Sequence, residues 1–325
     1  MKPEKMKAAV YYKYGLPDVV RIDEINIPSP NDKQVLIKVH AATVNRTDCG
    51  FRSAEYFIVR FFSGLFKPKR PVLGNEFAGE IIEIGKAVTC FKVGDKVFGY
   101  NDTQFGAHAE YMVMDEDKAI AILPKNYTYE KAAPILEGCH YAYADLKAAK
   151  LKSGQKILIN GGTGGIGSAA VQLSKYLGAE VTAVCSGKHF DLLKSLGADV
   201  VIDYHKEDFT QRQHSFDVVF DAVGKSSFGK CKPILNKGGI YMSTELGKHS
   251  QNPFLAMITP FLGGKKVLFP IPFINKSDVL FFKDLVEQGK FTPVVDKHYT
   301  LNQIVDAYTY VETGEKIWNV VININ

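Results

Sequence analysis

The chain has 325 residues, of which 46% are hydrophobic, and a formal net charge of +5. This length favours two domains, because single cores rarely grow beyond about 250–300 residues. The small charge is carried by scattered lysines and gives no reason to expect a nucleic-acid partner. The five cysteines are widely spaced and form no CxxC pair, which excludes a four-thiolate zinc lobe. They suit a reducing compartment, so we expect a cytoplasmic location.

The first third of the chain predicts short β-strands separated by turns, in segments such as 35–39, 80–85 and 93–99. After Pro124 the pattern changes to alternating helices and apolar strands. The expected helices are 130–149, 165–177 and 189–196, and the expected strands are 156–160, 180–185, 199–203, 216–221 and 239–244. Such alternation builds a parallel sheet with helices on both faces. A last helix is expected at 277–288, and strand-like segments return after Phe291.

The most specific motif is the glycine-rich segment 160–167, which follows an apolar strand and begins a helix. In such a turn one glycine permits the tight bend, a second lets backbone N–H groups approach a pyrophosphate, and a third lets the helix pack on the strand. We assign these roles to Gly162, Gly164 and Gly167. The turn therefore predicts a bound dinucleotide, held by Gly162, Thr163, Gly164, Gly165, Ile166 and Gly167.

The segment after the next strand bears on the choice of cofactor. NAD sites usually carry an acidic residue there, about twenty residues past the glycines, to bind the ribose 2′-hydroxyl. This chain instead has Ser186 and Lys188, which can bind a 2′-phosphate, so we expect NADPH. Asp191 is the nearest acid, and its place in the following helix favours a capping or dipole role. An ordinary solvated loop remains the alternative for Ser186 and Lys188.

Several segments, taken in order, resemble the zinc-independent medium-chain dehydrogenase/reductases of the quinone oxidoreductase-like branch. The similar segments are 45–48, 74–80, 93–99, 132–134, 161–167, 196–199, 221–224 and 314–316. The resemblance implies a Rossmann-type domain, a GroES-like catalytic domain, a cleft between them and hydride transfer from a nicotinamide. It also adds Val223 to the residues expected to bind the cofactor.

We therefore predict an α/β fold in which a Rossmann-type doubly wound parallel sheet is inserted into a GroES-like β-rich domain. The catalytic domain is expected to comprise residues 1–127 and a return segment, 291–325, with the dinucleotide-binding domain at 128–290.

The resemblance also bears on zinc. In zinc-using relatives the positions matching Asn45, Asn75 and Glu137 hold cysteine, histidine and cysteine. Catalytic zinc needs about three anionic or imidazole ligands, and two of these residues are neutral amides, so no metal is expected. Cys139 and His140 are the only nearby substitutes, and neighbouring residues on one helix point in different directions.

Without a metal, hydrogen bonds must polarise the substrate carbonyl. Asn45 is the first candidate, because the resemblance implies that the matching asparagine lies near the nicotinamide and can donate to an enolate oxygen. The alternative is a turn asparagine that bonds its own backbone. Tyr56 is the second candidate, as a phenol that protonates the enolate or orients substrate, with simple packing as its alternative.

The segment 51–70 is unusually aromatic and basic, and a second aromatic stretch runs from Phe254 to Phe273. Three interpretations of the first segment remain open: a lid over a hydrophobic substrate pocket, a dimer surface, or a patch on an anionic membrane. The pocket is favoured, and the membrane patch is favoured least because the aromatic residues keep no helical period. A homodimer is expected.

The function predicted is metal-free, NADPH-dependent reduction of an activated double bond or a quinone. The substrate would be a small hydrophobic carbonyl compound, such as a 2-alkenal or an enone, or a quinone. Two alternatives remain: an alcohol/carbonyl dehydrogenase of the same family, and a non-catalytic NADPH-binding protein that regulates a partner or a membrane contact.

Overall fold

The computed structural model describes residues 4–213 and 215–324, which form two compact units. Unit 1 comprises residues 1–136 and 274–325, and unit 2 comprises residues 137–273. The units divide at 136/137 and 273/274, whereas the sequence predicted 127/128 and 290/291. The second boundary differs because helix α9 (Lys276–Glu287) packs against strand β7 (Ile120–Ile122) and so joins the first unit.

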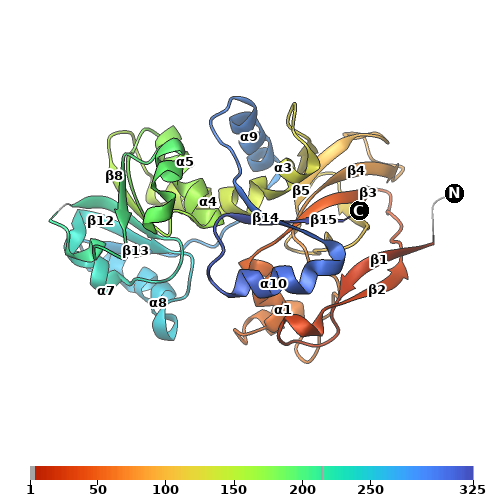
Figure 1. The fold of residues 1–325 in the computed structure, drawn as a ribbon, viewed down its shortest axis with the longest axis horizontal. Helices are drawn as coiled ribbons and strands as arrows, with labels where there is room; N and C mark the ends of the chain where they lie inside the picture. Colours follow the sequence, from red (N-terminus) through yellow and green to blue (C-terminus); the bar gives the residue numbers. More distant parts are fainter. Residues whose placement is uncertain (1–3, 214, 325) are drawn as a thin grey trace. The chain divides into compact units, whose positions relative to one another are not determined.

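Unit 1 is built on two β-sheets (Figure 1). In the described residues a two-stranded antiparallel sheet pairs β1 (Lys5–Val10) with β2 (Arg21–Asn26). A seven-stranded sheet follows the order β14-β15-β3-β4-β5-β7, with β6 also paired to β3. Its remaining strands are β3 (Gln34–Val44), β4 (Glu76–Ile84), β5 (Lys96–Tyr100), β6 (Tyr111–Asp115), β14 (Val295–Thr300) and β15 (Asn319–Asn323).

Strand β3 is the centre of the larger sheet. Most of its eleven residues are buried, because neighbouring strands flank it and helices or loops cover it. It pairs antiparallel with β15, so that Thr43 lies opposite Val321. The C-terminal segment therefore completes a sheet that the N-terminal segment begins.

Unit 2 is a six-stranded parallel sheet in the order β10-β9-β8-β11-β12-β13. Numbered from β8, this order is the 3-2-1-4-5-6 arrangement of Rossmann-type sheets, which confirms the predicted doubly wound sheet. Its strands are β8 (Lys156–Asn160), β9 (Glu180–Cys185), β10 (Val200–Asp203), β11 (Phe216–Asp221), β12 (Leu235–Ser243) and β13 (Lys266–Leu268).

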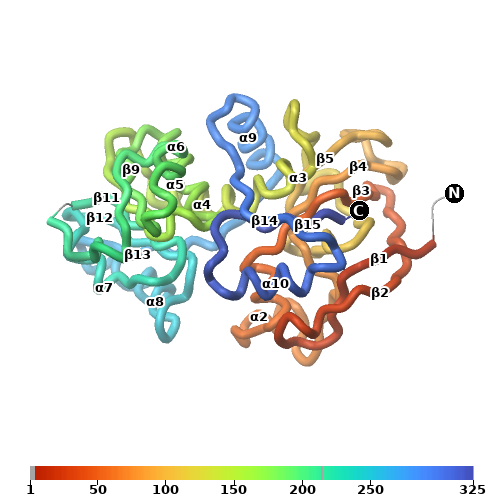
Figure 2. The backbone as a smooth tube through the Cα atoms, viewed as in Figure 1, coloured from red at the N-terminus to blue at the C-terminus, as the bar shows by residue number. Residues whose placement is uncertain are grey.

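Helices lie on both sides of this sheet. Figure 2 shows α5 (Gly165–Tyr176) and α6 (Phe190–Ser195) on one side of the strands, with α7 (Phe228–Cys231) and α8 (Gln251–Ile258) on the other. Because both faces are covered, the central strands are apolar on both faces, and Leu158, Val219 and Tyr241 belong to one buried cluster.

The predicted helix 130–149 is interrupted. It forms α3 (Tyr129–Ala132), a short 3₁₀ turn and then α4 (Leu136–Ala149). Pro134 lies in the interruption and has non-helical dihedral angles. Its ring also removes the N–H that a continuous helix would use.

Candidate active site

The glycine turn joins β8 to α5 and has the form of an anion-binding turn. Gly161 has φ +80°, a conformation that favours glycine. A Cβ on Gly167 would lie 2.0 Å from the carbonyl oxygen of Gly161, so the helix can pack on the turn only without a side chain there. The close-packing role predicted for Gly167 therefore agrees with its position.

The role of the tight bend was assigned to the wrong glycine. Gly161, not Gly162, takes the positive φ. At Gly162 a Cβ would lie 3.1 Å from side-chain atoms of both Ala183 and Leu193, so this residue permits the turn to pack against β9 and α6. The sequence alone does not reveal this, because two adjacent glycines are equivalent in the motif.

Gly164 is the N-cap of α5 and leaves open space at the start of the helix. Its backbone is extended, and the nearest atom to a Cβ placed there would be the carbonyl oxygen of Gly161 at 3.5 Å. Residues Thr163 to Ile166 are all partly exposed. The first N–H groups of a helix lack partners within the helix and attract anions, so this end of α5 fits a pyrophosphate.

The ends of β8 and β11 meet beside this turn, at the point where the strand order of the sheet reverses. Asn160 Nδ2 donates to Asp221 Oδ1 across 3.0 Å, and the Ser226 amide donates to Asp221 Oδ2 across 2.7 Å. This buried carboxylate thereby holds the loop that carries Val223. Nucleotides bind in open α/β sheets at this kind of position.

Val223 lies directly against the turn. A Cβ added to Gly161 would come within 2.3 Å of Val223 Cγ1. The structure therefore brings Val223 together with the predicted glycine turn.

The expected 2′-phosphate loop follows β9. Ser186 is partly buried and Lys188 is exposed, and in the described part of the chain neither side chain has a hydrogen-bond or ion-pair partner. Asp191 lies in the first turn of α6, as expected.

Two further residues belong beside this loop and were missed by the sequence reasoning. Asp203 pairs with Cys185 at the end of β10, and a Cβ on Gly187 would lie 2.6 Å from Asp203 Oδ2. Tyr204 follows it with its side chain exposed. The pairing of β10 with β9 brings together segments that are separated in sequence. Only a prediction of the strand order could therefore have identified these two residues.

In unit 1, Asn45 caps helix α1 (Arg46–Ser53). Its Oδ1 accepts a hydrogen bond from the Asp48 amide at 3.1 Å, and Asp48 Oδ2 accepts from the Asn45 amide at 3.1 Å. The alternative considered for Asn45 was a turn residue that bonds its own backbone. The structure shows this role in the form of a reciprocal capping box. The spacing Asn45-x-x-Asp48 is a signal from which Asp48 could have been found.

Asn45 also belongs to a buried chain of amides. Its Nδ2 donates to Asn75 Oδ1 across 2.8 Å, and Asn75 Nδ2 donates to the hydroxyl of Tyr100 across 3.2 Å. An amide nitrogen carries two N–H donors, and among the described residues Asn45 Nδ2 uses one of them. We call Asn45, Asn75 and Tyr100 the amide chain.

The donor set of the amide chain does not fit catalytic zinc. Two neutral amides that bond each other supply neither a thiolate nor an imidazole. In the residues that the structure describes, no group of three His, Cys, Asp or Glu side chains could hold a metal ion.

Tyr56 lies in the turn between α1 and α2 (Val59–Ser63), and its side chain is 45% exposed. Its carbonyl oxygen accepts a hydrogen bond from the Val59 amide. It is not among the residues that line the cavity of this unit.

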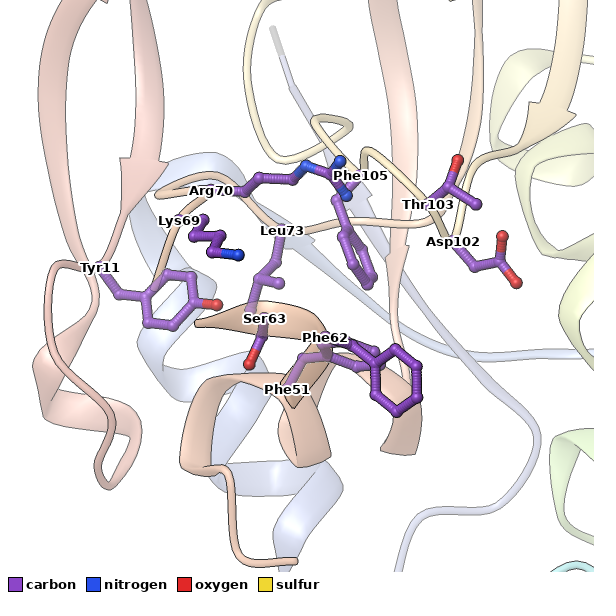
Figure 3. Close-up of a pocket in the computed structure, with 10 residues that line it drawn as sticks. All are labelled: Tyr11, Phe51, Phe62, Ser63, Lys69, Arg70, Leu73, Asp102, Thr103 and Phe105. Carbon is purple, nitrogen blue, oxygen red and sulfur yellow. The ribbon is translucent and has the colours of Figure 1, made fainter. Parts of the chain in front are cut away.

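That cavity has a volume of about 470 Å³ and lies between α1, α2 and the segments around residues 70 and 103 (Figure 3). Its lining residues are Tyr11, Phe51, Phe62, Ser63, Lys69, Arg70, Leu73, Asp102, Thr103 and Phe105. Phe51 and Phe105 form an aromatic pair with centroids 4.8 Å apart. The aromatic-basic segment 51–70 thus contributes to a pocket, while Phe57, Phe61 and Phe66 of the same segment are exposed.

The cavity and the amide chain are formed by neighbouring backbone segments. The Gly74 amide, next to Leu73, donates to Asp48 Oδ1 across 3.0 Å. The Asn101 amide, next to Asp102, donates to the Asn75 carbonyl across 2.7 Å. The two features therefore lie on neighbouring residues of one unit.

Several buried ionisable groups lie on helix α1 or near it. Burial raises the pKa of Asp48 to about 7, against the opposing effect of its two backbone hydrogen bonds. Burial lowers the pKa of His108 to about 4, and its Nε2 lies 2.8 Å from the Thr43 carbonyl oxygen. Arg52 is fully buried, pairs with Glu312 and lies over the Tyr308 ring at 4.9 Å.

In the described residues, no helix combines the length and the apolar character that crossing a membrane requires.

Comparisons with known proteins agree with both units. Residues 31–125 match the family model "Alcohol dehydrogenase GroES-like domain", and residues 196–322 match the model "Zinc-binding dehydrogenase". The chain is 34% identical to 2-methylene-furan-3-one reductase of Solanum lycopersicum, over 99% of this chain and 80% of that protein. It is 32% identical to the chloroplastic NADPH-dependent alkenal/one oxidoreductase of Arabidopsis thaliana, over 98% and 80% of the two chains.

The structure of the quinone oxidoreductase from Coxiella burnetii superposes with a TM-score of 0.88 at 27% identity, covering 99% of this chain and 100% of that one. These matches confirm the predicted GroES-like and Rossmann-type units. The chain is an oxidoreductase that belongs to the medium-chain dehydrogenase/reductase family, in its quinone oxidoreductase-like branch.

Proposed function

We propose that this protein is a metal-free, NADPH-dependent reductase that transfers hydride to the activated double bond of a 2-alkenal or enone, or to a quinone. The observation that carries the proposal is the amide chain, because it supplies a buried N–H donor instead of metal ligands. The names of the relatives above, a furanone reductase, an alkenal/one oxidoreductase and a quinone oxidoreductase, support the same chemistry.

NADPH, when bound, supplies the hydride. Gly164 and the first turn of α5 would hold its pyrophosphate, with Gly161 and Gly167 allowing the close approach. Ser186 and Lys188 would bind the 2′-phosphate, and the exposed phenol of Tyr204, whose amide donates to the Cys185 carbonyl, would assist them.

Asn45 would act on the substrate oxygen. Its remaining Nδ2 hydrogen can donate to the oxygen on which negative charge develops, and its bonds to Asp48 and Asn75 hold the amide in one orientation. Preorganised donors of this kind stabilise the transition state more than the ground state. Tyr56, being exposed, would exchange protons with water and deliver the last proton or orient substrate.

The test is a steady-state screen of NADPH oxidation over alkenals, enones, quinones and saturated aldehydes. The proposal predicts turnover with at least one of the first three classes and a preference for it over the aldehydes. A preference for an alcohol–aldehyde pair would favour the carbonyl dehydrogenase alternative. NADPH binding without turnover of any acceptor would favour a non-catalytic regulatory protein.

We further propose a homodimer formed through the edge of the unit 2 sheet. β13 ends the sheet, and exposed apolar side chains surround it, with Phe261 88% and Phe273 77% exposed. A second copy would cover both the unpaired strand edge and these side chains. Light scattering after gel filtration should give twice the chain mass, and Phe261→Asp should give the monomer.

We also propose a cytoplasmic location. All five cysteines are free and four are buried, which suits a reducing compartment. Some relatives carry chloroplastic names, so fractionation of cells with an antibody to the chain is the deciding measurement.

A further inference from the structure

The cavity of unit 1 carries positive charge at one side. Lys69 and Arg70 both line it, and in the part of the chain that the structure describes neither forms an ion pair or a side-chain hydrogen bond. Cationic groups that line a cavity without an acidic partner attract an anionic ligand.

Tyr11 adds a neutral donor to the same side. Its ring is 2% exposed, and among the described residues its hydroxyl has no hydrogen-bond partner. Burial raises the pKa of this phenol, so the hydroxyl stays protonated and can donate. Figure 3 shows the Tyr11 hydroxyl and the Lys69 ammonium pointing inward, toward Leu73.

One carboxylate opposes these groups. Asp102 is the acidic residue of the lining, and Figure 3 places it with Thr103, across Phe105 from Lys69. The lining therefore has two cations against one carboxyl group. Burial raises the pKa of Asp102.

The other walls are apolar. Phe51, Leu73 and Phe105 form them, and Phe62 lies at the opening with 75% of its surface exposed. A volume of about 470 Å³ falls within the range of small-molecule sites, which combine apolar walls with few polar groups. The cavity is therefore amphipathic, with a cationic side and an aromatic body.

The cavity also lies within reach of the amide chain. Phe51 is six residues after Asn45 on the same helix, which corresponds to about 9 Å along the helix axis. Leu73 is two residues before Asn75 of the amide chain, and Asp102 follows Asn101, whose amide donates to the Asn75 carbonyl. A molecule that reaches from Asn45 into the cavity would therefore be elongated, with its reacting end and its tail at opposite ends.

We propose that this cavity binds the tail of the substrate and that the tail is anionic: the preferred substrates are amphipathic carboxylates that carry an enal or enone at one end. Lys69, Arg70 and Tyr11 bind the carboxylate, while Phe51, Phe62 and Phe105 pack against the apolar chain. This inference rests on the proposed reductase function, whose substrate class it narrows.

The first experiment compares two substrates in the wild-type protein: a medium-chain 2-alkenal whose far end carries a carboxylate, and the methyl ester of the same compound. The carboxylate should have a higher kcat/KM by about tenfold. Exposed charge pairs contribute modestly, so Lys69→Gln and Arg70→Gln should each reduce this ratio about two- to fivefold and together abolish it. The ester, which has no carboxylate for these cations to bind, is the reference substrate for each variant, so the ratio of acid to ester is the quantity compared.

Lys67→Gln is the matched control, since Lys67 is an exposed cation of the same segment that does not line the cavity. It should leave the ratio intact. Asp102→Asn should raise the ratio, because it removes the opposing carboxylate. Equal kcat/KM for acid and ester in the wild type would overturn the anionic-tail proposal while leaving the reductase function in place.

A second experiment does not depend on turnover. Titration calorimetry measures binding of octanoate, a saturated carboxylate, and of octan-1-ol to the wild type and to the Lys69→Gln/Arg70→Gln variant. Octanoate should bind the wild type more tightly than the alcohol does, and the double variant should lose this difference. If none of the alkenals, enones and quinones is reduced but octanoate binds in this way, the reductase function fails and the anion site stands. If octanoate shows no advantage over octan-1-ol, the anion site is overturned.

Discussion

The side-chain amide of Asn45 donates a hydrogen bond to Asn75 Oδ1 across 2.8 Å, and both residues are buried. This bond joins the residue that caps α1 to the residue that precedes β4. It holds the Asn45 amide in one orientation and leaves one donor hydrogen available, so one side chain can combine the structural role with the proposed chemical role.

Asn45→Ala should lower kcat by about 10²–10³-fold, the usual effect of losing one preorganised oxyanion donor. The same change removes an N-cap and should cost about 1 kcal/mol in the free energy of unfolding. Asn45→Ser separates the two effects, since serine retains the cap but its shorter side chain loses the amide donor. Steady-state kinetics and thermal melts measure both. A near-normal kcat in a folded Asn45→Ser protein would reduce Asn45 to a capping residue.

Chelators should leave the activity unchanged. The amide chain offers neutral donors where zinc would need thiolate or imidazole ligands, so dialysis against a strong chelator should not alter kcat. Elemental analysis of the purified protein should find no stoichiometric zinc. Activity that disappears on chelation and returns with added zinc would contradict the metal-free mechanism.

Lys188→Glu should abolish or reverse the preference for NADPH over NADH. A charged hydrogen bond to the 2′-phosphate is worth roughly tenfold or more in kcat/KM, and a glutamate there would repel the phosphate. Lys194→Glu makes the same change of charge in the last turn of α6 and is the control. Equal use of both cofactors by the wild type would show that Ser186 and Lys188 form only a solvated loop.

Asp203→Asn should strengthen the same preference. The Asp203 carboxylate lies against Gly187, between Ser186 and Lys188, and so opposes a phosphate bound there. Asparagine can still accept the hydrogen bond from the His205 amide. We expect the KM for NADPH to fall about two- to fivefold with the KM for NADH unchanged. An unchanged KM for NADPH would place the phosphate elsewhere.

The stability of the protein should respond to two buried groups with opposite signs. The folded-state pKa of His108 is about 4, below its ordinary value of 6.5, so its contribution is present above pH 6.5 and is lost as pH falls toward 4. The folded-state pKa of Asp48 is about 7, above its ordinary value, so its contribution is present at low pH and is lost as pH rises toward 7. The two effects oppose each other between about pH 4 and 6.5.

His108→Gln removes the first of these effects. Over the range from pH 6.5 to 4, the melting temperature of the variant should rise more, or fall less, than that of the wild type as pH decreases. Differential scanning calorimetry at several pH values measures this difference. Parallel curves for the two proteins would mean that His108 does not titrate with a lowered pKa.

The parallel sheet was the part of the fold best predicted from sequence. β8, β9 and β11 have the expected bounds because they are short apolar runs ended by glycine, serine or aspartate. Helix α10 (Ile304–Glu312) was missed, since its β-branched and aromatic residues predict a strand. Its buried residues Ile304, Ala307, Tyr308 and Val311 follow helical spacing, so tertiary packing decides its structure.

The candidate site could be predicted from sequence only where one short motif contains its residues. Gly164 and Gly167 follow from spacing, and Asn45 from the resemblance. The cavity could not be predicted, because it combines Tyr11, Leu73 and Phe105, which are far apart in sequence and are brought together by backbone hydrogen bonds between loops. Asp203 was missed for the same reason, since only the pairing of β10 with β9 places it beside Gly187.

The pairing of β3 with β15 has a consequence for the order in which the chain folds. During synthesis β3 emerges before unit 2, whereas β15, the strand that covers its edge, emerges after unit 2. Unit 2 is continuous in sequence and can complete its sheet first, while unit 1 waits with an apolar strand edge unpaired. The nucleotide-binding unit would thus form before the catalytic sheet closes, and the pairing of β15 with β3 would end the exposure of this strand edge to aggregation.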